Sequence, residues 1–217
     1  MAASAASRCS ERWVPVAKRK NNTLERKKPT REYRKICWVS AEGQTERDYL
    51  TMNVFRNLPD VTVRFPKDIH PGRRNPGQVL KRFQKALRTE DFRKDDEAWL
   101  VVDVDEWDDA EFTELLAWAK VDPRHNLAIS NPKFELFLVM HFERGNGCTT
   151  PQAVDSALKK HLPKYAKRIN ASQFTVAQVR AAIENARMKR AGCGSDIPDP
   201  GMTDAHLLAE RLLGSAE

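Results

Sequence analysis

Short apolar runs alternate with segments of helical periodicity along the chain from residue 31 onward. Residues 35–40 (KICWVS), 61–66 and 127–130 predict strands, and residues 98–104 (AWLVVDV) are apolar at nearly every position, as in a strand covered on both faces. Residues 45–58, 79–87 and 109–120 lie between these strands and carry apolar side chains at helical spacing. This alternation predicts an α/β fold with a mostly parallel sheet flanked by helices.

The chain after residue 130 is predicted to be mainly helical. Residues 133–142 follow Asn131-Pro132 and are apolar on most sides of a helix, so we expect this helix to be buried. Residues 151–161, 176–190 and 204–213 predict three more helices, joined by turn-rich segments such as GCGSDIPDPG. We therefore expect three parts: a basic arm over 1–34, an α/β domain over 35–145, and an α-helical extension over 146–217 packed on the same domain.

The positive charge of the chain is concentrated at its N-terminus. The 37 basic and 30 acidic residues give a net charge of +7, and residues 1–35 hold 11 of the basic and three of the acidic ones. That leaves 26 basic and 27 acidic residues, so the remainder is almost neutral. A basic arm on a near-neutral body can attract nucleic-acid phosphates through counterion release. The competing interpretation is a solvated leader without a binding role.

Composition excludes several classes of protein. The mean hydropathy is −0.63, and no apolar run approaches the roughly 20 residues of a membrane helix, so a membrane-spanning protein is excluded. The N-terminal residues lack the apolar core of a secretory signal. The cysteines lie far apart without a CxxC pair, which argues against a disulfide framework or a structural zinc site: Cys9, Cys37, Cys148 and Cys193. We expect a cytoplasmic protein with reduced thiols and no membrane partner.

Two pairs of acidic residues follow predicted strands. Glu42 and Glu46 lie in AEGQTE after the first strand, and Asp103 and Asp105 end the apolar strand. Ligands of open parallel sheets bind at the carboxyl ends of the strands, so both pairs are expected to face one crevice. Clustered carboxylates repel one another unless a cation is present, and Mg²⁺ prefers oxygen ligands. The competing interpretation is that the acids after residue 104 only cap the following helix.

Three further polar residues lie close to these strand ends in the predicted fold. Glu135 is the only charged residue inside an apolar helical run, so it either faces the acidic crevice or accepts hydrogen bonds from backbone or an Arg. Ser130 and Asn131 end a predicted strand and can support the site, or they can cap the helix that opens at Pro132. We expect His141 to pack at the edge of the core.

The order of these motifs is similar to that of known proteins. A strand followed by EGxTE and a helix, and about sixty residues later an apolar strand ending in DxD, resembles the Toprim domain of topoisomerases, bacterial primases and several nucleases. EGQTERDYL, VVDVDEW and AISNPKFELFLVMHF more closely resemble the RloB-like family of prokaryotic defence proteins, over residues 34–162. This resemblance implies a Toprim-like fold and a metal-dependent nuclease that uses Mg²⁺ or Mn²⁺ and is encoded beside an ATPase partner or a restriction system.

The resemblance also implies roles for particular residues. Glu42, Asp103 and Asp105 would be catalytic, with general acid–base work for Glu42. All three would also bind metal, and Glu46 would be an additional metal residue. The number of metal ions stays open.

The leading hypothesis is therefore a metal-dependent nuclease that cuts RNA, with transfer RNA as one candidate, or DNA, in phage defence or abortive infection. Its nucleic-acid backbone contacts are expected in the arm and in a Pro- and Gly-rich loop over 70–77: Lys27, Lys28, Arg31, Arg73 and Arg74. The alternative is a non-catalytic module of a defence complex that binds nucleic acid or an effector. No GxxxxGK[ST] sequence is present, so the chain is not itself an ATPase of the phosphate-loop type.

Overall fold

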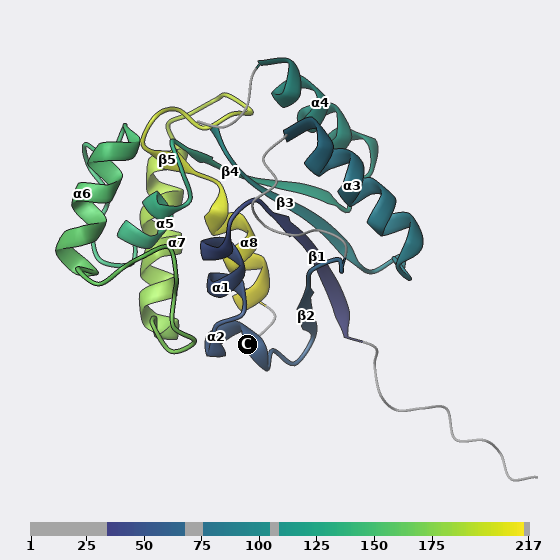
Figure 1. Ribbon diagram of the computed structural model, residues 1–217, viewed down its shortest axis with the longest axis horizontal. Coiled ribbons are helices and arrows are strands. Elements are labelled where there is room, and N and C mark those ends of the chain that lie inside the picture. The colour runs from purple at the N-terminus through teal and green to yellow at the C-terminus, as the bar shows by residue number, and fades with distance from the viewer. Residues whose placement is uncertain (1–33, 68–75, 105–108, 215–217) are drawn as a thin grey trace, which may run out of the picture. The chain divides into compact units, whose positions relative to one another are not determined.

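The computed structural model describes residues 34–67, 76–104 and 109–214, which lie within one compact unit, Tyr33–Glu217. Five strands and eight helices are described there (Figure 1): β1 (Lys35–Ala41), α1 (Gln44–Leu50), α2 (Asn53–Arg56), β2 (Val61–Arg64), α3 (Pro76–Thr89), β3 (Glu97–Asp103), α4 (Asp109–Val121), β4 (His125–Asn131), α5 (Glu135–Val139), α6 (Pro151–His161), α7 (Val176–Arg190), β5 (Met202–Thr203) and α8 (Ala205–Leu213). None of the helices in these ranges combines the length and apolarity needed to cross a membrane.

The sheet has the strand order β2-β1-β3-β4-β5. The first four strands are parallel, and only β5 runs antiparallel to its neighbour β4. The parallel register pairs Ala41 of β1 with Val101 of β3, and Val101 with Ala128 of β4. The carboxyl ends of these three strands therefore lie together at one edge of the sheet.

The sheet is covered by helices on both faces, as the apolar strand 98–104 predicts. Alternate residues of each strand point to opposite faces, and Trp99 and Val101 accordingly belong to one buried cluster while Leu100 and Val102 belong to the other. The first cluster packs against α1, α2 and α5–α8, and the second packs against α3 and α4. The predicted α/β class, with a mostly parallel sheet flanked by helices, is confirmed.

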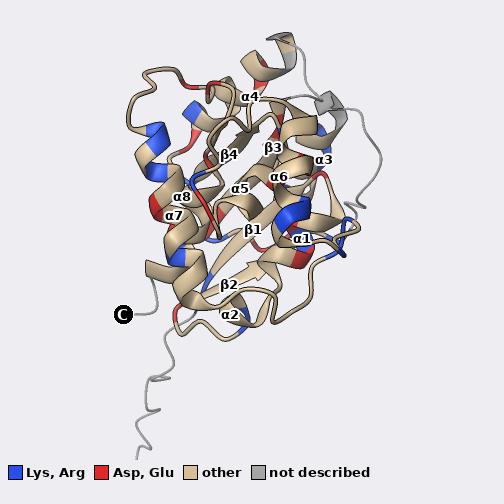
Figure 2. Cartoon of the chain, turned by 90° about the vertical axis from the view of Figure 1, so that its left-hand side faces the viewer, with Lys and Arg blue, Asp and Glu red and all other residues tan. Residues whose placement is uncertain are grey.

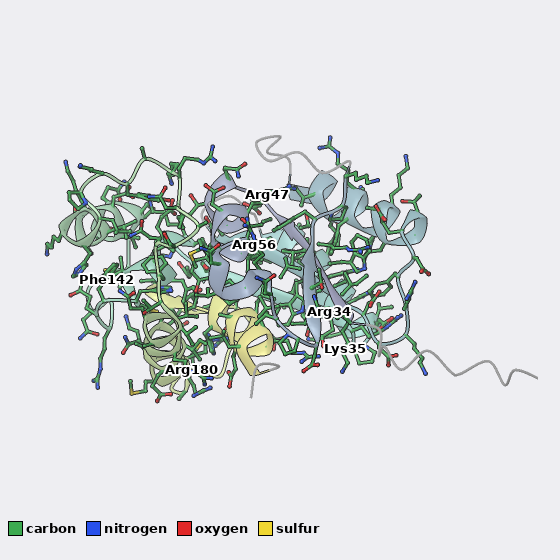
Figure 3. All side chains as sticks on the ribbon, turned by 90° about the horizontal axis from the view of Figure 1, so that it is seen from below. Arg34, Lys35, Arg47, Arg56, Phe142 and Arg180 are labelled. Carbon is green, nitrogen blue, oxygen red and sulfur yellow. The ribbon has the colours of Figure 1, made fainter. Side chains whose placement is uncertain are left out.

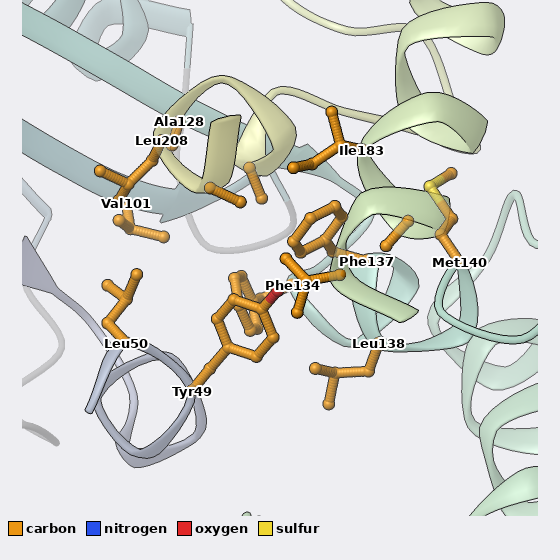
Figure 4. Packing of buried hydrophobic residues seen from close by; sticks show 14 of the residues in the cluster. Tyr49, Leu50, Val101, Ala128, Phe134, Phe137, Leu138, Met140, Ile183 and Leu208 are labelled. Atoms are coloured by element: carbon orange, nitrogen blue, oxygen red, sulfur yellow. The ribbon is translucent and has the colours of Figure 1, made fainter. Parts of the chain in front are cut away.

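Helix α5 lies at the centre of the first cluster. All five of its residues are buried, and Phe137 within it makes edge-on ring contacts with Tyr49 of α1 and with Phe134. Figure 4 shows these rings between Leu50 and Val101 on one side and Ile183 of α7 on the other. The apolar run predicted to be a buried helix thus joins the sheet to the helices that follow it.

Polar contacts stabilise the C-terminal elements and attach them to the sheet. Within α7, a capping box between Thr175 and Gln178 stabilises the first turn of the helix. Farther along, Arg190 donates to Asp204 (2.7 Å) just before α8. Near the end of α8, Arg211 donates to Glu97 of β3 (2.7 Å). The predicted division of this unit into a domain and a helical extension stays a prediction.

Several strand and helix ends differ from prediction by a few residues: β2 ends at Arg64, β4 spans His125–Asn131, and α3 begins at Pro76, inside the predicted 70–77 loop. Three differences are larger. The single helix expected over 45–58 is two helices, α1 and α2, because the chain turns at Thr51, whose hydroxyl donates to the carbonyls of Arg47 and Asp48. The helix expected over 133–142 is shorter: α5 spans Glu135–Val139 and follows a cis Asn131-Pro132 peptide bond. The third difference is β5, which lies in a segment predicted to be turns.

Candidate functional site

Four acidic residues gather where the parallel strands end, and we call this group the acidic edge: Glu42, Glu46, Asp103 and Glu135. Glu42 directly follows β1, and Asp103 is the last residue of the neighbouring strand β3. Both side chains are half-buried. The predicted placement of these two carboxylates at adjacent strand ends agrees with the parallel register between β1 and β3.

Glu46 belongs to the first turn of α1 and is buried. Its side chain folds back over Gly43, the N-cap of the helix. A Cβ atom added at Gly43 would lie 2.5 Å from Oε2 of Glu46, closer than atoms can approach. The glycine of EGxTE therefore leaves the space that the Glu46 carboxylate occupies.

Asp103 is oriented by the backbone of the segment that precedes α5. Its Oδ1 accepts a hydrogen bond from the N–H of Phe134 at 2.8 Å. A charged acceptor makes this bond stronger than one between neutral groups. The contact joins the end of β3 to the segment after β4 and fixes one oxygen of the carboxylate.

Glu135, the first residue of α5, accepts two hydrogen bonds through the same oxygen. The Tyr165 hydroxyl donates to Oε1 at 2.9 Å, and the Lys167 ammonium donates to it at 2.5 Å. Because Tyr165 donates to Glu135, the hydroxyl of Thr45, 2.7 Å away, serves as the donor to Tyr165. The sequence predicts that Glu135 either faces the acidic crevice or accepts from backbone or an Arg. In the structure the buried carboxylate belongs to the acidic edge and is paired with a lysine.

Lys167 brings positive charge to the acidic edge. Partial burial lowers its pKa, but the hydrogen bond to Glu135 and the negative charges of Glu135, Asp155 and Asp103 outweigh burial and raise the pKa above its usual value. The side chain is two-thirds exposed at 66 %. Its backbone has a φ of 58°, a left-handed conformation that is uncommon outside glycine.

The side chains of Ser130 and Asn131 contact residues of the chain that precedes α8. Ser130 is buried, and its hydroxyl is 2.8 Å from that of Thr203 in β5. Asn131 donates its side-chain amide to the carbonyl of Pro198 at 2.8 Å. Neither residue caps α5, since Phe134 is the N-cap of that helix. Their supporting role at the site stays a prediction.

Several predicted site residues lie outside the described part of the chain: Asp105, Lys27, Lys28, Arg31, Arg73 and Arg74. Among residues 34–67, 76–104 and 109–214, no group of three or more His, Cys, Asp or Glu side chains is placed to hold a metal ion. The predicted metal-binding and catalytic roles of Glu42, Glu46, Asp103 and Asp105 remain predictions.

Tyr165 and Lys167 are the contributors to the site that sequence reasoning missed. They lie 30 and 32 residues after Glu135 in the chain and 120 and 122 residues after Thr45. No local periodicity marks such distant pairs. The one available signal was the concentration of basic residues in KKHLPKYAKR, residues 159–168.

Comparison with known proteins agrees with the resemblance seen in the motifs. Neither the search of curated proteins nor the search of solved structures gave a match. The family model for RloB-like protein matches residues 37–212, a range that contains most of β1 and nearly all of α8 together with the whole acidic edge. This chain therefore belongs to the RloB-like family.

Proposed function

We propose that this protein is a metal-dependent nuclease that hydrolyses phosphodiester bonds of RNA or DNA. The observation that carries the proposal is the pair of half-buried carboxylates, Glu42 and Asp103, at the carboxyl ends of two adjacent parallel strands. This is where open α/β sheets bind their ligands. The order strand, EGxTE, helix and DxD, which resembles the Toprim domain, supports the same activity.

The donor atoms at the acidic edge fit Mg²⁺ or Mn²⁺. Mg²⁺ in phosphate-processing sites is held by one or two carboxylates, while water and substrate phosphates supply the other ligands. Glu42 and Asp103 are the described residues best suited to hold it, and Asp105 is a candidate for a further ligand. When bound, the metal would stabilise the charge that develops on the scissile phosphate.

The protein side chains would divide the remaining work. The Glu42 carboxylate would carry the proton between water and the phosphodiester oxygens, because it is the acidic residue nearest the end of β1 and is partly open to solvent. Asp103 has one oxygen fixed by the N–H of Phe134, so its second oxygen has a defined direction. Lys167 would supply a cation beside the phosphate, since it is both paired and exposed.

The biological setting that we propose is phage defence or abortive infection in the cytoplasm, with activity controlled by an ATPase partner. Membership of the RloB-like family supports a defence role. These 217 residues contain no phosphate-loop motif, so they would not themselves supply an ATPase of that type.

The test is cleavage of labelled transfer RNA, single-stranded DNA and duplex DNA by the purified full chain, with Mg²⁺, Mn²⁺ or EDTA. Glu42→Gln and Asp103→Asn remove a negative charge with little change of shape. Asp95→Asn is the matched control: Asp95 is exposed and precedes the amino end of β3, so it lies at the opposite end of the strand from Asp103. Each reaction is run with and without the ATPase encoded beside this protein.

We expect metal-dependent cleavage that is lost in Glu42→Gln and Asp103→Asn and kept in Asp95→Asn. Equal cleavage by all four proteins would contradict the proposal. Binding without cleavage in every reaction, including those with the ATPase, would instead support the alternative of a non-catalytic nucleic-acid-binding module.

A further inference from the structure

A run of basic residues lies next to the acidic edge. We call residues 159–168 the basic segment; they cover the end of α6 and the chain after it. Its five basic residues are all exposed, and it contains no acidic residue: Lys159, Lys160, Lys164, Lys167 and Arg168. Figure 2 shows the basic end of α6 on the side of the molecule that also carries α1 and its acidic residues.

Four hydrogen bonds hold the basic segment against the acidic edge and the adjoining helix α1. Lys167 pairs with Glu135, and Tyr165 links Glu135 to Thr45. One residue farther along, Arg168 donates to Asp48 of α1 at 2.7 Å. The segment is therefore attached to both helices, α1 and α5, that begin at the carboxyl ends of the strands.

The remaining cations of the segment are available to a ligand. Within the part of the chain that the structure describes, Lys159, Lys160 and Lys164 form no ion pair with an acidic residue. Long cationic side chains left unpaired beside an acidic group are suited to phosphate oxygens, because phosphate contacts release the counterions of a nucleic acid.

An open pocket of about 400 Å³ lies within this surface. Leu158, Leu162 and Tyr165 contribute apolar area to its wall, and Lys159 and Lys167 line the same pocket. The pocket also contains Asp155, whose negative charge is paired with Lys133 at 2.7 Å. Apolar surface with a few charged groups is typical of ligand sites. A nucleotide offers both components that this lining would contact, a flat base and a charged phosphate.

The first described basic residues, Arg34 and Lys35, lie at a different place from the basic segment. Figure 3 shows Arg34 and Lys35 where β1 begins, and Glu42 follows the other end of that strand. The seven residues of β1 span about 23 Å at roughly 3.3 Å per residue. The basic segment, by contrast, adjoins the acidic edge directly through the pair Lys167–Glu135.

We propose that the basic segment binds the phosphate backbone of the nucleic-acid substrate and leads the strand to the acidic edge, with Lys167 at the junction between the two. The inference rests on the proposed function for the identity of the ligand. It adds a binding surface in residues 159–168, apart from the arm and the 70–77 loop in which the sequence predicts backbone contacts.

The experiment measures binding separately from cleavage. Fluorescence anisotropy follows the full chain with labelled transfer RNA, single-stranded DNA and duplex DNA in EDTA, over a series of salt concentrations. The test variant replaces Lys159, Lys160 and Lys164 by Gln. The matched control replaces Lys81, Lys85 and Arg88 by Gln, because these three exposed cations lie together on α3, on the opposite face of the sheet.

We expect the test variant to bind about tenfold or more weakly at moderate salt. For single strands, the slope of log K against log salt should fall in magnitude by about 2, since each phosphate contact contributes about 0.7. The α3 control should lose much less affinity. Equal losses in the two variants, no loss in the test variant, or no binding by the unsubstituted chain would each overturn the inference.

Cleavage by the same variants separates this inference from the proposed function. Suppose that cleavage depends on Glu42 and Asp103, but that the test variant binds and cleaves nucleic acid like the unsubstituted protein. That result would support the nuclease and reject the binding surface. Specific loss of binding in the test variant, with no cleavage under any condition, would keep the surface and reject the nuclease.

Discussion

Acidification should destabilise this protein through one buried histidine, His141. Its ring is 4 % exposed, stacks on Phe174 at 4.0 Å between centroids, and lies edge-on to Tyr49. Nδ1 is 2.9 Å from the carbonyl of Phe137, and Nε2 is 3.0 Å from the Tyr49 hydroxyl. Because a carbonyl can only accept, Nδ1 carries the proton, and Nε2 accepts from Tyr49. This network fits the neutral imidazole.

The size of the effect follows from the pKa difference between the folded and unfolded states. Burial lowers the pKa of His141 from 6.5 to about 4, although its hydrogen bond with Phe137 opposes that shift. Between these two values the unfolded chain binds more protons than the folded one, so stability falls as pH falls. The full contribution is present above pH 6.5, and about 2 kcal/mol of it is lost between pH 7.5 and pH 5.

Urea unfolding at pH 7.5, 6.5, 5.5 and 5.0 measures this loss. His141→Gln stays uncharged over the whole range, so it should be less stable at pH 7.5 but lose about 2 kcal/mol less than the unsubstituted protein on acidification to pH 5. His161→Gln is the control, because that ring lies against Phe142 with its side chain 28 % exposed. If His141→Gln and the unsubstituted protein lost equal stability, titration of His141 would not be the cause.

Three further predictions concern the core, a helix cap and the acidic edge. Phe137→Ala should lower the free energy of unfolding by about 3–5 kcal/mol, because the ring is fully buried, whereas Phe142→Ala at the surface should cost several-fold less in the same urea experiment. Thr175→Ala should cost about 1 kcal/mol through loss of the α7 cap, and an unchanged urea midpoint would contradict this. Glu135→Gln should lower the pKa of Lys167, because it removes a negative charge that raises that pKa. NMR of the lysine Cε measures the titration, and an unchanged pKa would show that Glu135 does not raise it.

The sequence predicts the sheet well because its signals are local. The apolar run 98–104 predicts a strand covered on both faces, and β3 spans Glu97–Asp103 between two buried clusters. The placement of Glu42 and Asp103 follows from the same pattern, since parallel strands bring their carboxyl ends together. Periodicity and strand order are enough to derive this part of the candidate site.

The remaining features depend on contacts between distant residues, which periodicity does not encode. Met52 is one of the apolar residues whose spacing predicts a continuous helix over 45–58. The chain instead turns at Thr51, and Met52 is fully buried at that turn. The two-residue strand β5 exists through its pairing with Ser130 and Asn131, some seventy residues earlier. The partner of Glu135 is likewise a lysine 32 residues away. His141, expected at the edge of the core, lies within it because Tyr49 and Phe174 enclose it.

The position of β5 and α8 at the end of the described chain has a consequence for synthesis on the ribosome. Strand β4 is complete at Asn131, but the elements that cover it end 82 residues later, at Leu213. At 5–20 residues per second, the growing chain carries an uncovered β4 for about 4 to 16 s. An open strand edge is a template for pairing with another chain. The nascent protein therefore passes through a stage in which it needs protection from aggregation, and that stage ends only when α8 has emerged and Arg211 reaches Glu97.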